Sequence, residues 1–354
     1  MTVIVTGGAG FIGSALVRQL NAAGESVVTV DKLTYAANLD NIANLPNPGL
    51  HRFVQLDICD RKGIGALYAE VKPRAVYHLA AESHVDRSID SPAPFIETNV
   101  TGTLVLLEAA LEYWRGLDEA GKAGFRHLQV STDEVYGDAE PESFFTENSP
   151  YKPNSPYAAS KASSDHLARA FGRTYGLPIL VTNCGNNYGP YQFPEKLIPL
   201  MILNALDGKG LPVYGKGDQV RDWIHVEDHA AALRMVMDRG RVGETYLIGA
   251  RGTRQNLEIV HTICGLLDDH APQPTGRKYA EYIRYVTDRP GHDKRYAIDP
   301  AKCETELGWK PVYDVATGLR QTVKWYLENS EWCRRASGAY DRGRIGLSGS
   351  VAKG

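Results

Sequence analysis

Short apolar runs alternate with longer stretches of helical pattern through the first half of the chain. Strands are expected at residues 3–6, 26–30, 52–56, 75–79, 127–131 and 178–182. Most of the intervals between them are long enough for a helix and its connections. Alternating strands and helices predict an α/β fold, a doubly wound parallel sheet with helices on both faces. In such a sheet the ligand binds at the carboxyl ends of the strands.

The pattern changes after Asn187, where prolines and glycines interrupt the short helices and loops of a second, smaller unit. Two pieces are expected to return to the sheet: residues 223–236 as a helix and Thr245–Ile248 as a strand. Amphipathic helices are expected at 256–267 and 318–329. The predicted organisation is therefore interleaved, with a sheet domain of residues 1–187 and 222–249, a smaller C-terminal domain of 188–221 and 250–335, and a flexible tail of 338–354.

Composition narrows the class of protein. The 354 residues exceed one average domain, and the 43% hydrophobic and 23% charged residues describe an ordinary globular protein. A formal net charge of −3 gives no electrostatic reason to bind nucleic acid or an anionic membrane. The chain enters its first strand within a few residues, and no apolar run approaches the ~20 residues that a membrane span needs. Neither a signal peptide nor a span is expected.

The cysteines indicate a reducing compartment. The chain has five of them, an odd number, and no two form a C-x-x-C pair. This pattern argues against a disulfide framework and against a zinc cluster. The protein is therefore expected to be cytoplasmic and to hold no metal.

A glycine-rich turn follows the first expected strand and opens a helical run. Its glycines include Gly7, Gly10 and Gly13, spaced G-x-x-G-x-x-G. Such a turn lets backbone N–H groups approach a pyrophosphate while the helix N-terminus faces the charge. Asp31 ends the second strand, where a carboxylate can accept hydrogen bonds from a ribose and repel a 2′-phosphate. The pattern predicts a Rossmann domain that binds NAD rather than NADP.

Tyr157 and Lys161 stand four residues apart on an expected helix that begins at Ser155-Pro156, an N-cap residue followed by proline. The spacing places both side chains on one face of the helix. An ammonium beside a phenol is expected to lower the pKa of the phenol from about 10 toward working pH. The pair is then a base that removes a hydroxyl proton while a hydride leaves the same carbon.

Three polar residues, Thr132, Asp133 and Glu134, follow the fifth expected strand at the ligand-binding edge of the sheet. Thr132 can hydrogen-bond the oxygen that Tyr157 deprotonates. Neighbouring carboxylates in a closed site should have pKa values pushed apart, so that one is protonated while the other is ionised. The pair offers an additional acid and base that a plain alcohol dehydrogenase does not need.

Taken together, these motifs resemble those of the dTDP-glucose 4,6-dehydratases, a family of extended short-chain dehydrogenase/reductases. The similarity covers about residues 1–340, and the matching segments are 6–13, 31–35, 78–86, 131–137, 155–165, 186–190, 193–200, 215–223 and 288–299. The chain departs from the family at Ala37, where Gly is usual, and at Leu247, where Asn is usual. Neither lies among the catalytic positions. The resemblance implies an NAD-dependent lyase of nucleotide-sugar metabolism and deoxysugar biosynthesis.

The resemblance also implies a redox-neutral cycle that turns dTDP-glucose into dTDP-4-keto-6-deoxyglucose. Tyr157, with Lys161 and Thr132, helps to oxidise C4 as its hydride passes to NAD⁺. Glu134 then removes the C5 proton, and Asp133 protonates the departing C6 hydroxyl. The hydride finally returns to C6. The assignment of acid and base comes from the resemblance, because the spacing alone leaves it open.

Binding contacts are a further implication of the resemblance. The cofactor contacts would be Gly7, Gly10, Phe11, Ile12, Gly13, Asp31, Lys32, Leu33, Thr34, Asp57, Ile58, Leu79, Ala80, Ala81, Ser83, Thr98, Tyr157, Lys161 and Asn187. The substrate contacts would be Ser83, Thr132, Asn186, Lys196, Leu197, Pro212, Val213, Tyr214, Arg221, Asn256, Asp288, Arg289, Pro290, Gly291 and His292. The cations among them, Lys196, Arg221 and Arg289, suit the two phosphates of a nucleoside diphosphate.

Several alternatives stay open. A UDP-glucose 4,6-dehydratase can carry the same Thr-Asp-Glu triplet, so the sequence does not separate thymine from uracil. A UDP-sugar 4-epimerase has no use for Asp133 and Glu134, and UDP-glucuronate decarboxylases usually lack the aspartate. A non-catalytic NAD-sensing protein is disfavoured by the complete acid–base set. Because the family is commonly dimeric, a homodimer is expected through helices at 94–113 and 157–175.

Overall fold

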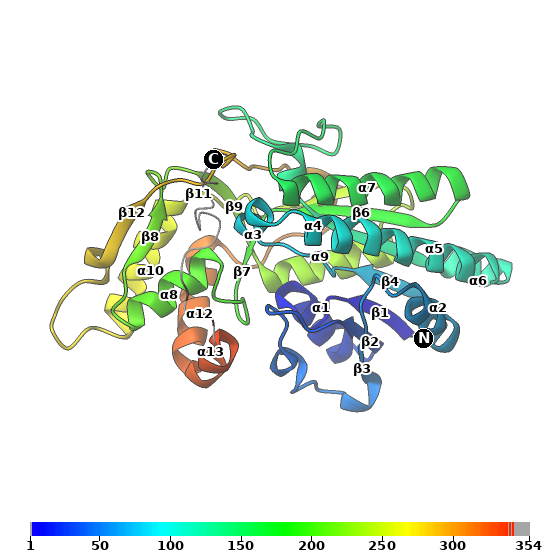
Figure 1. Cartoon of the computed structure of the whole chain (residues 1–354), viewed down its shortest axis with the longest axis horizontal. Coiled ribbons are helices and arrows are strands. Elements are labelled where there is room, and N and C mark those ends of the chain that lie inside the picture. Colours follow the sequence, from blue (N-terminus) through cyan, green and yellow to red (C-terminus); the bar gives the residue numbers. More distant parts are fainter. Residues whose placement is uncertain (1, 339, 341, 343–354) are drawn as a thin grey trace, which may run out of the picture.

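A parallel sheet organises one region of the molecule, the sheet region (Figure 1). This computed structural model describes residues 2–338, 340 and 342, so most of the predicted flexible tail lies outside the described residues. The sheet has seven strands in the order β10-β6-β5-β4-β1-β2-β3, and its neighbouring strands are parallel. They are β1 (Thr2–Thr6), β2 (Ser26–Asp31), β3 (His51–Gln55), β4 (Ala75–His78), β5 (Arg126–Thr132), β6 (Ile179–Cys184) and β10 (Thr245–Ile248). The predicted α/β doubly wound fold is confirmed.

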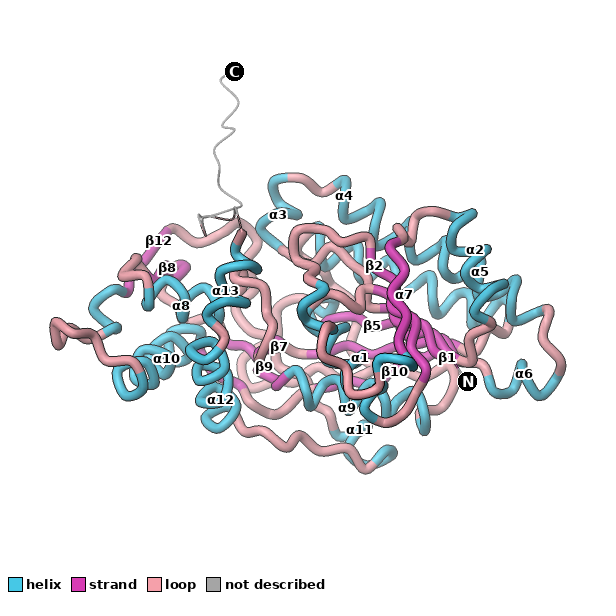
Figure 2. Tube along the Cα trace, turned by 90° about the horizontal axis from the view of Figure 1, so that it is seen from below, coloured by secondary structure: helices cyan, strands magenta, loops and turns pink. Residues whose placement is uncertain are grey.

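Helices cover both faces of this sheet (Figures 1 and 2). One face carries α1 (Phe11–Ala22) and α9 (Val226–Arg239), and the other carries α2 (Arg61–Val71), α5 (Gly102–Arg115) and α7 (Pro156–Tyr175). Successive residues of a strand point to opposite faces, so Val3 and Val5 enter the first core and Ile4 enters the second. Because both faces are buried, the strands are continuous apolar runs.

Short helical segments complete the connections of the sheet region. They are η1 (Leu39–Ile42), η2 (Pro48–Leu50), α3 (Val85–Asp90), α4 (Ala93–Phe95), η3 (Ile96–Thr101), α6 (Glu119–Gly124), η4 (Asp133–Tyr136) and α11 (Ala301–Leu307). Of these, α3 and η4 follow the carboxyl ends of β4 and β5, and they matter most for the site.

A second region with its own core lies at one end of the molecule, on the left in Figure 1. Its core includes the fully buried side chains of Ile202, Ile263 and Val323. Its helices are α8 (Leu197–Leu206), α10 (Asn256–His270), η5 (Tyr279–Tyr282), α12 (Val315–Glu328) and α13 (Ser330–Ser337). Its strands are β8 (Leu211–Tyr214) with β12 (Ile283–Val286), and β9 (Val220–His225) between β7 (Asn186–Tyr188) and β11 (Thr253–Gln255).

One predicted element begins in the wrong place. The helix expected at residues 223–236 starts at Val226, because Trp223–His225 belong to β9 and pair in parallel with Asn186–Tyr188. The His225 side chain then caps α9 by accepting a hydrogen bond from the N–H of Glu227. A buried strand that runs directly into a helix has no turn residue to mark the boundary, and the apolar pattern continues across it.

The described residues also set limits on other sites. None of the described helices is both long and apolar enough to cross a membrane. Within the same residues, no group of three or more His, Cys, Asp or Glu side chains could hold a metal ion. All five cysteines are free thiols.

Candidate active site

A cleft of about 290 Å³ opens along the carboxyl edge of the sheet. The glycine turn after β1, the segments that follow β2, β4, β5 and β6, and the first turns of α7 line it. The predicted cofactor residues in its lining are Gly7, Gly10, Phe11, Ile12, Gly13, Asp31, Lys32, Thr34, Ile58, Leu79, Ala80, Ala81, Ser83, Thr98, Tyr157, Lys161 and Asn187. The predicted substrate residues there are Ser83, Thr132, Asn186 and Lys196.

The turn after β1 requires glycine at two positions. Gly7 has a φ of 71°, in the left-handed region, and a Cβ there would lie 2.7 Å from the backbone nitrogen of Ala80. A Cβ on Gly13 would collide with the carbonyl oxygen of Gly7. The helix α1 begins at Phe11, and its N-cap, Gly10, supplies no side-chain hydrogen bond. The first N–H groups of α1 are therefore available to an anion in the cleft, such as a pyrophosphate.

Asp31 anchors the cofactor end of the cleft. Its Oδ2 accepts a hydrogen bond from the N–H of Ala9 at 3.1 Å, and its Oδ1 accepts one from the N–H of Leu33 at 2.9 Å. Burial raises the pKa of the carboxyl, and these two hydrogen bonds and the charge of Lys32 oppose that rise. Each carboxylate oxygen keeps a further lone pair for a ribose hydroxyl. Two predicted contacts, Leu33 and Asp57, do not line the cleft.

Tyr157 and Lys161 lie near the start of α7, whose N-cap is Ser155, as predicted. The Nζ of Lys161 donates a hydrogen bond to the carbonyl oxygen of Val130 at 2.8 Å. Burial raises the pKa of the Tyr157 phenol well above its usual value, and the charge of Glu134 raises it further. The predicted lowering of this pKa is therefore wrong for the protein alone, since the phenol is buried beside a carboxylate while the ammonium binds a backbone carbonyl.

Asp133 is the more deeply buried of the two predicted carboxylates. Thr132 caps the turn η4, because its Oγ1 accepts a hydrogen bond from the N–H of Glu134 at 3.3 Å. The same hydroxyl donates to Oδ1 of Asp133 at 3.3 Å. The Oδ2 of Asp133 has no hydrogen-bond partner among the described residues. Burial and the charge of Glu134 raise the pKa of Asp133 well above its usual range, which favours the protonated form.

Glu134 stands among cations. Burial raises its pKa above the usual value, and the charges of Arg289, Arg221 and Lys196 limit that rise. Three nearby positive charges favour the ionised carboxylate, so this group is suited to act as a base. The pKa of Asp133 is raised well above its usual range, whereas three cations limit the rise at Glu134, so the two pKa values are pushed apart in the sense expected from the sequence.

The remaining predicted substrate residues lie outside the cleft lining, on the second region. They are Leu197, Pro212, Val213, Tyr214, Arg221, Asn256, Asp288, Arg289, Pro290, Gly291 and His292. The Nη2 of Arg221 donates to the carbonyl oxygen of Asp293 at 2.8 Å, and its guanidinium carbon lies 4.2 Å from the centre of the Tyr296 ring. Arg221 and Arg289 both lower the pKa of Glu134, so the polar site extends from the cleft into the second region.

Similarity to known proteins identifies the family. Residues 4–322 match the family model described as GDP-mannose 4,6 dehydratase. A curated dTDP-glucose 4,6-dehydratase from Escherichia coli is 57% identical over 96% of this chain and 97% of its own length. The chain belongs to the dTDP-glucose 4,6-dehydratase family.

Solved structures of dTDP-glucose 4,6-dehydratases share the fold of this family member. DesIV from Streptomyces venezuelae, with NAD and TYD bound, is 46% identical and covers 95% of this chain and 100% of its own, with a TM-score of 0.86. The enzyme from Bacillus anthracis, in complex with NAD, is 43% identical and covers 95% of this chain and 99% of its own, with a TM-score of 0.84.

The residues of this dehydratase-family chain fit NAD. The glycine turn leaves the space that a Cβ at Gly7 or Gly13 would fill, and the N-terminus of α1 opens beside it. A carboxylate, Asp31, stands at the end of β2, where a 2′-phosphate would require a cation. These features suit a pyrophosphate and an unmodified ribose.

Sequence reasoning missed several residues that line the cleft of this dehydratase-family chain. They are Val30, Ala36, Ala37, Leu56, Val130, Ser131, Cys184, Gly185, Gln192, Phe193 and Glu195. Val30, Ser131 and Cys184 lie at or next to the ends of strands, so the strand-end rule that selected Asp31 could also have selected them. No local signal marks Gln192 as a lining residue, since a loop carries it into the cleft.

Proposed function

We propose that this protein is an NAD-dependent hydro-lyase that converts dTDP-glucose to dTDP-4-keto-6-deoxyglucose. One observation carries the proposal: Thr132, Asp133, Glu134, Tyr157 and Lys161 line a single cleft together with a glycine turn suited to a dinucleotide. Oxidation of an alcohol needs a base and a hydride acceptor, whereas loss of water also needs a second acid–base pair. The identity to curated dTDP-glucose 4,6-dehydratases supports dTDP-glucose as the substrate.

Tyr157 is the base of the first step in this proposal. It takes the proton of the C4 hydroxyl, while Thr132 hydrogen-bonds the same oxygen. Bound NAD supplies the hydride acceptor, the later hydride donor and a positive ring charge that favours a neighbouring phenolate. Lys161 adds a second positive charge within the same buried environment. The glycine turn and Asp31 hold the cofactor.

Glu134 and Asp133 perform the elimination. A ketone at C4 makes the C5 proton acidic, and the ionised Glu134 removes it. The protonated Asp133 gives its proton to the C6 hydroxyl, which leaves as water. The different surroundings of the two carboxyl groups support this order of roles, because burial and the charge of Glu134 raise the pKa of Asp133 well above its usual range, while three cations limit the rise at Glu134.

The test is turnover with dTDP-glucose and UDP-glucose in parallel, without an added oxidant. Purified protein should carry bound NAD and form a 4-keto-6-deoxy sugar nucleotide, with dTDP-glucose preferred and no free NADH accumulating. Stoichiometric NADH would instead make the protein a net dehydrogenase. A 4-epimer as product would make it an epimerase, and turnover of UDP-glucose alone would reassign the nucleotide.

The variant Tyr157→Phe tests the proposed base. Removing the phenolic oxygen should lower turnover by about 10²–10⁴-fold, the usual contribution of a positioned general base, with little effect on nucleotide binding. Tyr285→Phe is a matched control, because Tyr285 is 61% exposed on β12. Full activity of Tyr157→Phe would make Tyr157 a packing residue.

We further propose a cytoplasmic homodimer. The five free thiols support a reducing compartment. Ala159, Ser163, His166 and Ala170 form one exposed stripe along α7, and the three small side chains among them suit close packing against a second copy. Analytical ultracentrifugation should give the mass of a dimer, and Ala170→Glu should shift it toward the monomer. A monomeric wild-type protein would contradict the dimer.

A further inference from the structure

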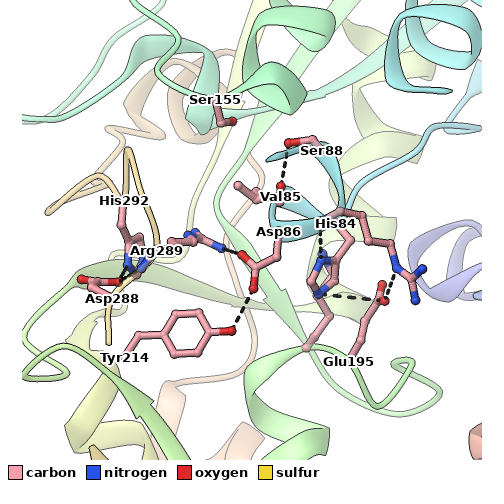
Figure 3. Close-up of polar contacts among 12 residues, drawn as sticks. His84, Val85, Asp86, Ser88, Ser155, Glu195, Tyr214, Asp288, Arg289 and His292 are labelled. Carbon is pink, nitrogen blue, oxygen red and sulfur yellow. Dashed lines mark hydrogen bonds and ion pairs between the residues drawn. The ribbon is translucent and has the colours of Figure 1, made fainter. Parts of the chain in front are cut away.

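The short helix α3 lies where the sheet region meets the second region (Figures 1 and 3). His84 is its N-cap, with a side chain that accepts a hydrogen bond from the N–H of Arg87. The Nε of Arg87 donates to Oε2 of Glu195 at 3.2 Å. The Nζ of Lys196 donates to the carbonyl oxygen of Ser83 at 2.9 Å. The start of α3 is therefore bound to the loop that precedes α8.

Asp86, in the first turn of α3, is bound to two other segments (Figure 3). Its Oδ1 accepts a hydrogen bond from Nη1 of Arg289 at 2.8 Å, and its Oδ2 accepts one from the hydroxyl of Tyr214 at 2.8 Å. Asp86 is 4% exposed. Burial alone would raise its pKa, but the charge of Arg289 and these hydrogen bonds hold the pKa below its usual value. Asp86 is thus an ionised, buried carboxylate with a separate partner on each oxygen.

Both partners of Asp86 come from the second region. Tyr214 ends β8, and Arg289 follows β12, the strand that pairs with β8. Asp288 holds this segment from within the second region, since its Oδ2 accepts a hydrogen bond from Nε2 of Gln219 at 2.7 Å. Asp86 holds the same segment from the sheet region. Its contacts therefore fix β8 and the segment after β12 relative to the cleft.

Arg289 faces the proposed base. It is the first of the cations that lower the pKa of Glu134. The Nε of Arg289 is buried and has no hydrogen-bond partner among the described residues, so the guanidinium keeps a donor for an anion. An arginine side chain has many rotamers, and a carboxylate that binds its guanidinium restricts it to few of them. Asp86 therefore determines where the charge of Arg289 stands.

We propose that Asp86 is a positioning residue for the nucleoside diphosphate of the substrate. It holds Arg289 and Tyr214 in the geometry that binds the nucleotide, and it acts through them rather than on the substrate. The proposal rests on the proposed function and on the substrate contacts that the family resemblance implies for Arg289 and Tyr214. Replacing a merely structural ion pair would change the stability of the fold and leave the affinity of the folded protein for the nucleotide unaltered. Replacing a positioning residue would change that affinity.

Binding of dTDP, which cannot react, tests this proposal on the NAD-loaded protein. Asp86→Asn should weaken dTDP binding by about 10- to 100-fold, the factor for losing one charge-assisted contact. KM for dTDP-glucose should rise by a similar factor, with bound NAD unchanged. Asp86→Asn combined with Arg289→Gln should weaken dTDP binding by less than the product of the two single losses. Asp90→Asn, an exposed acid of the same helix, is the control.

Wild-type affinity for dTDP in Asp86→Asn would overturn the proposal, as would additive losses in the double variant. If Asp86→Asn does not fold, Asp86→Glu decides, because it keeps the charge and displaces the guanidinium by one methylene. That variant should bind dTDP several-fold more weakly, and unchanged affinity would contradict the proposal. Wild-type protein that binds dTDP without dehydrating dTDP-glucose would reject the function alone. Wild-type protein that binds neither dTDP nor UDP would reject both.

Discussion

At the scale of single residues, Asp133 and Glu134 owe their different tasks to their surroundings. Adjacent acids have similar intrinsic pKa values. Asp133 is buried near another acid, Asp222, whose charge raises its pKa further, although Arg221 opposes this. Glu134 faces Arg289 and two further cations. The neighbours that separate the two groups come from the second region, so the chain positions a proton donor beside a proton acceptor through long-range contacts.

Glu134→Gln should stop the cycle after oxidation at C4. The amide cannot accept the C5 proton, so turnover should fall by about 10²-fold or more while dTDP-glucose still binds. Because Tyr157 and Lys161 remain, the bound cofactor should still be reduced. Absorbance at the NADH band should rise and persist, and the C5 proton should exchange only slowly with solvent deuterium.

Asp133→Asn should fail at a later point. The C5 proton should exchange with deuterium, since Glu134 remains, but the C6 hydroxyl should leave slowly without its proton donor. Glu140→Gln, an exposed acid beyond the same turn, should behave like the wild type. Normal turnover by both site variants would make the pair surface acids and the chain an epimerase-like protein. Exchanged phenotypes would reverse the two roles.

The sequence predicted where the acid–base residues lie, but it did not predict the ionisation of Tyr157. Position follows from local rules, because Thr132, Asp133 and Glu134 follow one strand and Lys161 lies one helical turn after Tyr157. Ionisation depends on groups brought together by the fold. The pKa of the phenol is raised by burial and by Glu134, which is distant in sequence.

At the scale of elements, the start of α7 determines where two of these residues stand. Ser155 is its N-cap, and the Oγ accepts a hydrogen bond from the N–H of Ala158 at 3.0 Å. Pro156 follows as the first helical residue, where its missing N–H costs nothing. Tyr157 and Lys161 lie within the next turns, so the cap sets the register and the direction of both side chains.

Ser155→Ala should cost about 1 kcal/mol of stability, the usual value of an N-cap hydrogen bond. Turnover should fall as well, because a frayed first turn moves Tyr157 away from Thr132. Ser143→Ala is the control, since Ser143 is exposed and its Oγ donates to the nearby carbonyl of Glu140. Urea unfolding and kcat should be measured for both. Equal losses would mean that the cap has no special role.

Element boundaries were predictable only where a residue marks them. Ser155-Pro156 marks the start of α7 correctly. Nothing comparable separates β9 from α9, so the helix was predicted to begin at Trp223 although it begins at Val226. The strand identity of Trp223 depends on pairing with Asn186 of β7, a contact that periodicity does not reveal.

At the scale of the whole molecule, the site is completed by two regions with separate cores. The sheet edge could be predicted from alternating strands and helices, because parallel strands bring their carboxyl ends together. Arg221 and Arg289 could be predicted only through family resemblance. Both arginines approach Glu134 only because the second region packs against the sheet region. The hydrogen bond between Arg289 and Asp86 depends on the same packing.

Buried neutral histidines couple the fold to pH. His127 is fully buried in β5, and both of its ring nitrogens lack a hydrogen-bond partner among the described residues. Burial lowers its pKa from 6.5 to about 4. Burial likewise lowers the pKa of His229, in α9, to about 3. Between pH 6.5 and these values the unfolded chain binds protons that the folded protein excludes, so each of these histidines contributes stability that is lost as the pH falls.

His127→Phe should therefore flatten the dependence of stability on pH. The contribution of His127 is fully present above about pH 6.5 and declines toward pH 4, by about 1.4 kcal/mol per pH unit. The free energy of unfolding of the wild type, from urea melts between pH 7 and 4.5, should fall faster than that of the variant by up to this slope. His261→Gln, on the exposed face of α10, is the control. Parallel curves for His127→Phe and the wild type would show that His127 accepts a proton without unfolding.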